Sequence, residues 1–296
     1  MISPTAYLNE VVDAMRTFSV HRKEIDWSVF RESVLKAGAS AQTIPETYAA
    51  IRMALGLLGD HHSSYTGADG TLIGNPSFPP CFVDFPPVVL NLPPDIGYVR
   101  VSASNGNSDA TYAAALQAAV RGADTDAVRG WIVDLRGNGG GASYPMIAGI
   151  GPILGEGTAG YFISPESDPY PWGYDSRGSW GGPFHAVFVA VGAPYSLKRP
   201  NPRVAVLTSR WVASAGEAVA VAFRGRPNTR TFGTATCGVP TGNAGHILSD
   251  GANLVITGAY DADRNLVTYN DQLPPDEVIE DVSGLLQRAI EWLRSA

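Results

Sequence analysis

The stretch Trp131-Ile-Val-Asp-Leu-Arg-Gly-Asn-Gly-Gly-Gly141 decides the fold of this chain. It begins as an apolar run, Trp131 to Leu135, and stops at a charged loop crowded with glycine. Apolar runs of this length bounded by glycine indicate buried strands. Glycine gives the loop the backbone freedom to turn several N–H groups toward one point. Such a strand end can hold either a phosphate or the oxyanion of an acyl-transfer intermediate.

Strands and helices alternate on both sides of this stretch. Expected strands cover 97–101, 131–135, 185–191, 203–208 and 253–257, and expected helices cover 109–120, 215–223 and 285–293. This alternation predicts an α/β core. Residues 160–184 are rich in glycine, proline and aromatic residues, so we expect them to form an irregular excursion.

The first sixty residues have the apolar spacing of helices. We expect helices over 7–18 and 27–35, the second capped by Asp26, and a third helix that runs to about residue 58. Glycine, proline and aromatic residues then dominate the next segment. The predicted organisation is a helical N-terminal subdomain at 1–66, a linker or lid at 67–94 and an α/β catalytic core at 95–296.

Composition narrows the class of protein. Of 296 residues, 45% are hydrophobic and 17% are charged, which is ordinary for a compact α/β protein. The net charge is −7 and no cluster of lysine and arginine interrupts it, which argues against a nucleic-acid or anionic-membrane partner. The chain shows neither a signal-peptide pattern nor an apolar run long enough to cross a bilayer. We therefore expect a soluble cytoplasmic protein in which Cys81 and Cys237 are reduced thiols.

Ser214 is the candidate nucleophile. It follows an expected strand and begins a helix of small residues, where the helix N-terminus favours developing negative charge. If the loops meet, the N–H groups of Ala215 and of Gly139 or Gly140 would form an oxyanion hole. The alternative is that Ser214 serves only as a helix cap. Glu217, near the start of the same helix, is expected to cap or stabilise it.

A serine nucleophile needs a base, and His61 and His62 lie together at the end of the third expected helix. His185 lies at a strand edge and His246 in a polar loop, so both are weaker candidates.

Three segments resemble signatures of the C-terminal processing peptidases, also called tail-specific proteases. Leu58-Gly-Asp-His-His-Ser63 resembles the Asp-x-His-Ser/Thr signature, Asp134–Gly141 the Asp-Leu-Arg-x-Asn-x-Gly-Gly loop, and Val212–Glu217 the nucleophile turn. Residues 232–238, 248–257 and 273–278 also fit. The resemblance implies a crotonase/ClpP-like core of strand–strand–helix units, a helical N-terminal portion, and serine hydrolysis without a metal or other cofactor.

The chain departs from this family at two points. Many members carry a lysine base after the nucleophile helix, but Val239 occupies that position here, which argues against a Ser–Lys pair. His62 instead matches the branch that resembles tricorn core and interphotoreceptor retinoid-binding protein relatives. Residues 67–94 are also too few and too rich in proline to form a PDZ module.

The third catalytic group and the role of Arg136 stay open at this point. A histidine base needs an orienting acceptor, and Asp271, with Asn270 as a neutral substitute, and Asp60 are equal candidates for it. Arg136 either pairs with a carboxylate to hold the glycine loop or binds a terminal carboxylate of the substrate.

The predicted function is hydrolysis of peptide bonds by a Ser214–His62 pair with a backbone oxyanion hole. Two alternatives remain: an esterase, amidase or acyltransferase that acts on a small molecule, and an inactive binding protein on the same fold. The predicted partner is a peptide or small acyl substrate, with no nucleic acid and no membrane, and a homo-oligomer is left open.

Overall fold

The computed structural model describes residues 2–81, 91–104 and 108–295 and contains two compact units. Unit 1 comprises Met1–Pro79, Ser164–Asp168 and Thr241–Tyr260, and unit 2 comprises Pro80–Ile163, Pro169–Pro240 and Asp261–Ala296. The predicted linker or lid at 67–94 begins inside unit 1, and its residues 82–90 lie outside the described residues. The whole is a mixed α/β protein with a helical N-terminal part, as the sequence predicted.

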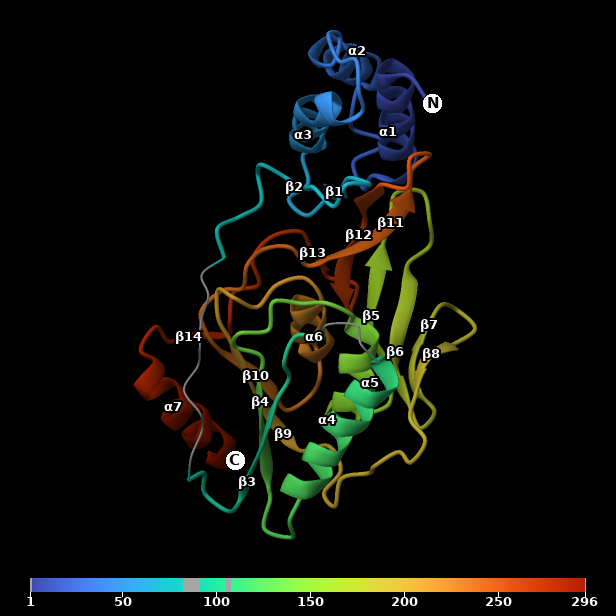
Figure 1. Ribbon diagram of the computed structural model, residues 1–296. Helices are drawn as coiled ribbons and strands as arrows, with labels where there is room; N and C mark the ends of the chain where they lie inside the picture. The colour runs from blue at the N-terminus through green and yellow to red at the C-terminus, as the bar shows by residue number, and fades with distance from the viewer. Residues whose placement is uncertain (1, 82–90, 105–107, 296) are drawn as a thin grey trace. The chain divides into compact units, whose positions relative to one another are not determined.

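Unit 1 begins with three helices that lie side by side (Figure 1, blue). They are α1 (Pro4–Phe18), α2 (Trp27–Ala37) and α3 (Tyr48–Leu57), the last preceded by the 3-10 helix η1 (Pro45–Thr47). The Asp26 carboxylate accepts hydrogen bonds from Ser28 N and Val29 N, which confirms it as the cap of α2.

The helices of unit 1 share a core with a small antiparallel sheet. The sheet contains β2 (Leu72–Gly74), β1 (Ser64–Thr66), the first part of β12 (Asn253–Asp263) and β11 (Thr241–Ile247). Tyr7 and Leu55 from the helices, and Leu58 directly after α3, are fully buried with Tyr65 and Ile256 from the strands. Residues far apart in sequence therefore build one core, which holds the turn that follows α3.

Unit 2 is built on a five-stranded parallel sheet. Its strand order is β14 (Glu277–Val278), β10 (Thr229–Gly233), β9 (Arg203–Thr208), β4 (Gly130–Asp134) and β3 (Ile96–Arg100). Every residue of β4 is buried, which explains the apolar run in the sequence, because a central parallel strand is covered on both faces.

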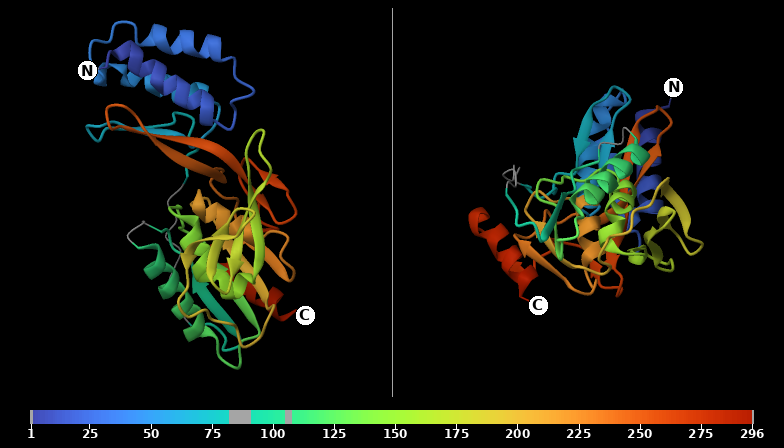
Figure 2. Two further views of the ribbon diagram at one scale, coloured as in Figure 1. Left: turned by 90° about the vertical axis from the view of Figure 1, so that its right-hand side faces the viewer. Right: turned by 90° about the horizontal axis from the view of Figure 1, so that it is seen from below.

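Helices cover both faces of this sheet (Figures 1 and 2). On one face, Val133 and Val206 pack with α4 (Asp109–Ala123), α5 (Ser143–Leu154) and α6 (Ala215–Phe223). On the other face, Ile132 and Ala205 pack with α7 (Val282–Arg294). The alternation of side chains along β4 and β9 thus divides the core into two layers.

Residues 157–190 form an antiparallel sheet, so the predicted irregular excursion at 160–184 is wrong. The strands are β5 (Gly157–Ile163), β6 (Tyr170–Asp175), β7 (Gly178–Gly181) and β8 (Ala186–Ala190), and each pairs with the next. The glycines that suggested irregularity make room for buried aromatic rings. A Cβ on Gly160 would lie 2.3 Å from the Trp172 ring and 2.6 Å from the Ala262 carbonyl oxygen.

We predict that Gly160→Ala destabilises the protein by about 1–3 kcal/mol, because the added methyl group overlaps the Trp172 ring and a backbone oxygen. Gly122→Ala in α4 is the matched control. A Cβ on Gly122 meets nothing within 4 Å, so that change should stabilise the helix by up to about 1 kcal/mol. Urea unfolding of both variants measures the difference, and equal midpoints would contradict the packing described for β5 and β6.

Candidate active site

The glycine loop after β4 meets the turn before α6, and Asn138 joins them. Its side-chain Nδ2 donates to Val101 O at 3.0 Å, and its Oδ1 accepts from Gly140 N at 3.0 Å. Its main-chain oxygen accepts from Ala213 N, also at 3.0 Å. Asn138 is completely buried, so these bonds hold the glycine loop and the nucleophile turn together.

The two segments touch so closely that side chains would separate them. Gly140 has φ +106°, and a Cβ there would lie 2.8 Å from Ser214 Cβ. From the other side, a Cβ on Gly216 would lie 2.6 Å from the Asn138 main-chain oxygen. Glycine at both positions therefore lets the loop pack directly against the nucleophile turn.

Ser214 occupies an unusual backbone conformation. Its φ of 53° and ψ of −123° place it in a region that residues with a Cβ rarely adopt. Backbone strain of this kind costs on the order of 1–3 kcal/mol and persists where the surroundings impose it. The residue is partly exposed and directly precedes α6, so its hydroxyl is next to a helix N-terminus.

Two of the three predicted oxyanion donors are available in unit 2. The N–H of Gly140 is taken by the Asn138 side chain. Within the described residues, the N–H groups of Gly139 and Ala215 form no hydrogen bond. Gly139 is exposed, and a Cβ on Gly140 would lie 3.3 Å from Ala215 N, so the loop and the helix start adjoin each other. The arrangement can stabilise negative charge beside Ser214.

Glu217 anchors the nucleophile turn from inside the protein. Its side chain is fully buried and accepts four hydrogen bonds, two on each oxygen. Ser214 N and Val239 N donate to Oε2 at 2.9 Å each, and Thr236 Oγ1 and Gly238 N donate to Oε1 at 2.5 and 2.8 Å. Burial raises the pKa of the Glu217 carboxyl to about 7, while these hydrogen bonds act in the opposite direction by stabilising the carboxylate.

The sequence reasoning predicted only a stabilising role for Glu217 at the start of the helix. The contacts with residues 236–239 were missed, because nothing in the local sequence indicates that a chain segment twenty residues later returns to this carboxylate. An acidic residue at the third position of a helix composed otherwise of small apolar residues was the one available signal.

Arg136 has the geometry of the first of its two predicted roles. Its Nε donates to Asp134 Oδ1 at 2.9 Å and its Nη2 donates to Asp134 Oδ2 at 2.8 Å. Both side chains are buried, and Tyr98 adds a third donor to the same carboxylate at 2.8 Å. The Arg136 guanidinium therefore links the loop, where Arg136 lies, to Asp134 at the end of β4.

The two carboxylates that were candidates for the third catalytic group lie in different units. Asp271, in unit 2, is exposed, and its Oδ1 accepts from Gln272 N at 2.7 Å. Asp60, in unit 1, is buried and accepts from His62 N and Ser63 N, each at 2.7 Å. Asp60 thus holds the backbone of the histidine turn, and no hydrogen bond joins it to the imidazole ring.

The His62 ring is held by two side chains that the sequence reasoning missed. Its Nδ1 lies 2.8 Å from Thr241 Oγ1 and 2.8 Å from Asn243 Nδ2, all within unit 1. Asn243 Nδ2 can only donate, so this contact makes Nδ1 the acceptor and puts the ring proton on Nε2. A half-turn of the Asn243 amide would let Nδ1–H donate and leave Nε2 free to accept a proton. Burial lowers the pKa of His62 to about 4, and nearby Asp60 offsets part of this effect. His61, by contrast, is exposed.

The cysteines form a disulfide between Cys81 and Cys237, so the prediction of two reduced thiols is wrong. Their Cα atoms are 5.3 Å apart, within the usual range for disulfides, although 156 positions separate them in sequence. Cys237 N donates to Val212 O at 2.9 Å, next to the nucleophile turn, and Cys237 packs with Ala213 and Val239. The bond ties the chain at residue 81 to the loop that holds Glu217.

We predict that the variant with Cys81→Ala and Cys237→Ala is about 2–4 kcal/mol less stable than the wild type, because its unfolded chain loses a constraint. Urea unfolding with and without dithiothreitol measures this. Reductant should lower the midpoint of the wild type and leave the double variant unchanged. An unchanged wild-type midpoint after complete reduction would contradict a stabilising role for the bond.

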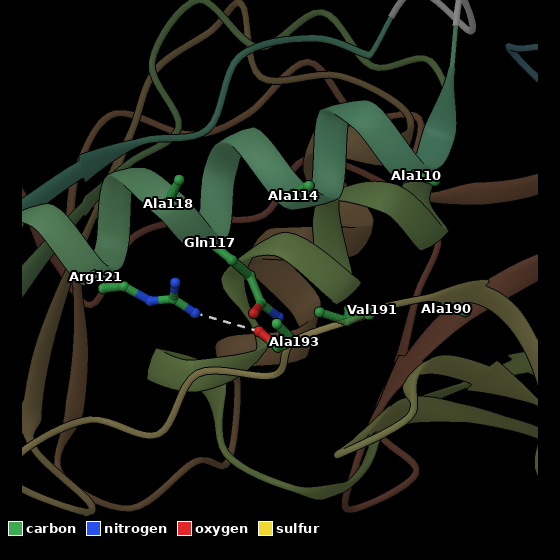
Figure 3. A pocket seen from close by; sticks show the side chains of 9 residues that line it. Ala110, Ala114, Gln117, Ala118, Arg121, Ala190, Val191 and Ala193 are labelled. Carbon is green, nitrogen blue, oxygen red and sulfur yellow. Dashed lines mark hydrogen bonds between the residues drawn. The ribbon is translucent and has the colours of Figure 1, made fainter.

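A surface cavity of about 350 Å³ lies elsewhere in unit 2, between α4 and the segment that leaves β8 (Figure 3). Its walls include Ala110, Ala114 and Ala118 on α4 and Ala190–Ala193 on the opposite side, and none of the predicted site residues lines it. The two polar side chains in it are already bonded: Gln117 donates to Ala148 O and Arg121 to Ala193 O. It is therefore not the candidate active site.

The described part of the chain contains neither a membrane-spanning helix nor a cluster of metal ligands. No helix there combines the length and apolar character that a membrane span requires. No group of three or more histidine, cysteine, aspartate and glutamate side chains there is arranged to hold a metal ion.

Both the sequence and the fold of this chain are similar to those of known proteins. Residues 95–279 match the model of peptidase family S41. The chain is 25% identical to a nisin-resistance protein of Lactococcus lactis subsp. lactis over 99% of its length and 88% of the relative's. Two solved structures share the fold. One is a lipoprotein of Streptococcus agalactiae (TM-score 0.74, 23% identity, 100% and 97% of the two chains), and the other is the photosystem II D1 C-terminal processing protease (TM-score 0.60, 19% identity, 97% of each chain).

Proposed function

Because the chain belongs to peptidase family S41 and is a serine peptidase-like hydrolase, we propose that Ser214 is its nucleophile and His62 its general base. The observation that carries this proposal is the meeting of the glycine loop with the nucleophile turn. There, a serine in a strained conformation adjoins the free N–H groups of Gly139 and Ala215. A serine that served only as a helix cap would need neither the strain nor the glycine loop.

In the proposed reaction, Nε2 of His62 takes the proton of the Ser214 hydroxyl as the oxygen attacks the carbonyl carbon of the peptide bond. The N–H groups of Gly139 and Ala215 stabilise the oxyanion that forms. The imidazolium then gives its proton to the leaving amine as the C–N bond breaks. Water, activated by the same imidazole, releases the acyl group from Ser214.

The base works through a positioning residue rather than a direct carboxylate partner. In the reactive tautomer the Asn243 amide is turned so that its Oδ1 faces the ring, and Nδ1–H of His62 donates to Thr241 Oγ1. Asp60 contributes through the backbone of His62. In this proposal Asp271 has no catalytic role, since it is exposed and already accepts from its neighbour's N–H.

The protein is also proposed to work outside the reducing cytosol. The Cys81–Cys237 disulfide supports this, because such bonds persist mainly in oxidising compartments. The similar proteins include one described as a lipoprotein and one described as a nisin-resistance protein, and both descriptions fit a protein that meets its peptide outside the cytoplasm. The cytoplasmic location was expected because the sequence shows no signal-peptide pattern and no membrane-spanning run, and the reduced thiols were inferred from that location.

We predict that Ser214→Ala and His62→Ala each lower kcat on a peptide substrate by roughly 10⁴-fold or more, and that the double variant loses little beyond either one. Members of one catalytic unit are expected to be non-additive in this way. His61→Ala is the matched control and should retain activity within about two-fold, since His61 is the exposed neighbour. If His62→Ala retained activity and His61→Ala did not, the base would be His61.

The pH dependence tests the state of the base. His62 must be neutral to accept a proton, and its pKa of about 4 lies below the ordinary value of about 6.5. We therefore predict that kcat/KM stays constant as the pH falls through 6 and reaches half its maximum only near pH 4. Circular dichroism at each pH confirms that the protein is folded. A half-maximum between about pH 6 and 7 would mean that the base titrates like a solvated histidine.

A further inference from the structure

Asp261, near the end of β12, has a buried carboxyl group without a hydrogen-bond partner. The residue is 1% exposed, and neither of its side-chain oxygens bonds to any described residue. Its main chain is well held, because its N–H donates to Pro240 O at 2.9 Å and the residue pairs with Tyr269 on β13 (Thr268–Tyr269). The fold thus fixes a carboxyl group in the interior and supplies nothing to replace the water that would solvate its charge.

The loop at 236–240 connects Asp261 with Glu217, the buried carboxylate of the nucleophile turn. Pro240 O accepts from Asp261 N, and the preceding residue, Val239, donates its N–H to Glu217 Oε2 at 2.9 Å. Consecutive residues of one loop are therefore bonded to the two acidic residues. The negative charge of Glu217 acts on Asp261, so the ionisation of one carboxyl group affects the other.

The hydrogen bonds decide which of the two carboxyl groups carries a proton. Glu217 accepts from three main-chain N–H groups, which can only donate, and from the Thr236 hydroxyl. The Thr236 oxygen already accepts from Leu273 N, so its hydrogen is free for Glu217. A proton on Glu217 would oppose one of these four donors, whereas a proton on Asp261 opposes none. Burial, and after it the charge of Glu217, raises the pKa of Asp261 to about 8.

The other elements around Asp261 bring no positive charge to it. Glu217 is the one charged residue of α6, and the neighbouring strand β5 contains no charged residue. On α5, Tyr144 is near enough for the charge of Asp261 to act on it, but burial raises the pKa of Tyr144 and the phenol stays neutral. On β13, the Tyr269 hydroxyl donates to Asp263. An ionised Asp261 would therefore face Glu217 without a compensating cation.

We propose that Asp261, as a neutral acid, is a positioning residue for Ser214. The inference rests on the proposed function, because it takes Ser214 as the nucleophile. While Asp261 keeps its proton, Glu217 holds the only charge behind the nucleophile turn and retains its four donors. When Asp261 gives its proton to the solvent in alkaline solution, two carboxylates repel each other in one interior. The loop at 236–240, which is bonded to both residues, then shifts, and Ser214 loses its support.

Urea unfolding from pH 5 to 9 tests the protonation state in the full chain. Asp261→Asn has nearly the shape of the neutral acid and cannot ionise. In the unfolded wild type Asp261 ionises above its ordinary pKa of 3.8, and in the folded protein only above about 8. The unfolded state therefore releases a proton that the folded state keeps, and the wild type loses stability relative to the variant as the pH rises. We expect the wild-type folding constant, divided by that of Asp261→Asn, to fall about ten-fold per pH unit up to about pH 8.

Asp109→Asn is the matched control for this measurement. Asp109 is exposed in the first turn of α4, so its carboxylate is solvated in the folded and the unfolded chain alike. The same ratio for Asp109→Asn should vary by less than about two-fold between pH 5 and 9. Asp261→Ser, which also cannot ionise, takes the place of Asp261→Asn if that variant does not fold.

The rate of fluorophosphonate labelling at Ser214 tests the positioning role. We expect the wild-type rate to be halved near pH 8, to be about ten-fold lower at pH 9, and to recover on return to pH 7. Asp261→Asn should keep its pH 7 rate within about two-fold at pH 9. A purely structural role for Asp261 would lower the rate of the variant at every pH and leave its alkaline decline in place.

Three results would overturn the proposal. A wild-type to Asp261→Asn folding ratio that does not change with pH would show that Asp261 is not a protonated acid. A constant wild-type labelling rate up to pH 10, or the same alkaline decline in Asp261→Asn, would exclude the positioning role. Failure of the proposed function looks different: no labelling of Ser214 at any pH removes the link to the nucleophile, while the folding ratios still report the proton on Asp261.

Discussion

The hydrogen bond from Ala213 N to the main-chain oxygen of Asn138 holds the candidate active site together. It joins two segments that are 75 positions apart, and the Asn138 side chain fixes the glycine loop by two further bonds. Glycine at 140 and 216 allows the approach, because a Cβ at either position would overlap the other segment. Ser214 in its strained conformation and the N–H group of Ala215 lie at this contact.

Behind the contact, a buried polar network keeps the nucleophile turn in place. Glu217 accepts from Ser214 N on one side and from residues 236–239 on the other, so the helix start and the following loop are fixed by one carboxylate. Each buried donor left unpaired would cost about 1–3 kcal/mol, which makes the arrangement stable only as a whole. The Cys81–Cys237 bond restrains the same loop covalently. The proposed oxyanion donors require this rigidity, since they would act only if they are already in position.

Local sequence patterns predicted the parts of this site that depend on neighbouring residues. The apolar run to Leu135, the glycine loop and the small-residue helix after Ser214 are each continuous in sequence, and the structure has them where they were expected. The partners of Glu217, the disulfide, and Thr241 on the His62 ring come from distant segments, so no spacing rule indicates them. Strands β5 to β7 were missed for another reason: glycine and proline usually mark loops, but here Gly160 makes room for the Trp172 ring.

The most direct test of this account is mass spectrometry of the protein after reaction with a fluorophosphonate, for the wild type and Gly140→Ala. The account predicts a single adduct on the peptide that contains Ser214 in the wild type. It predicts little or no adduct in Gly140→Ala, because a methyl group there would push the glycine loop away from the nucleophile turn. Circular dichroism must show that the variant is folded. Equal labelling of both proteins, or an adduct on another serine, would contradict the claim that this contact creates the catalytic serine.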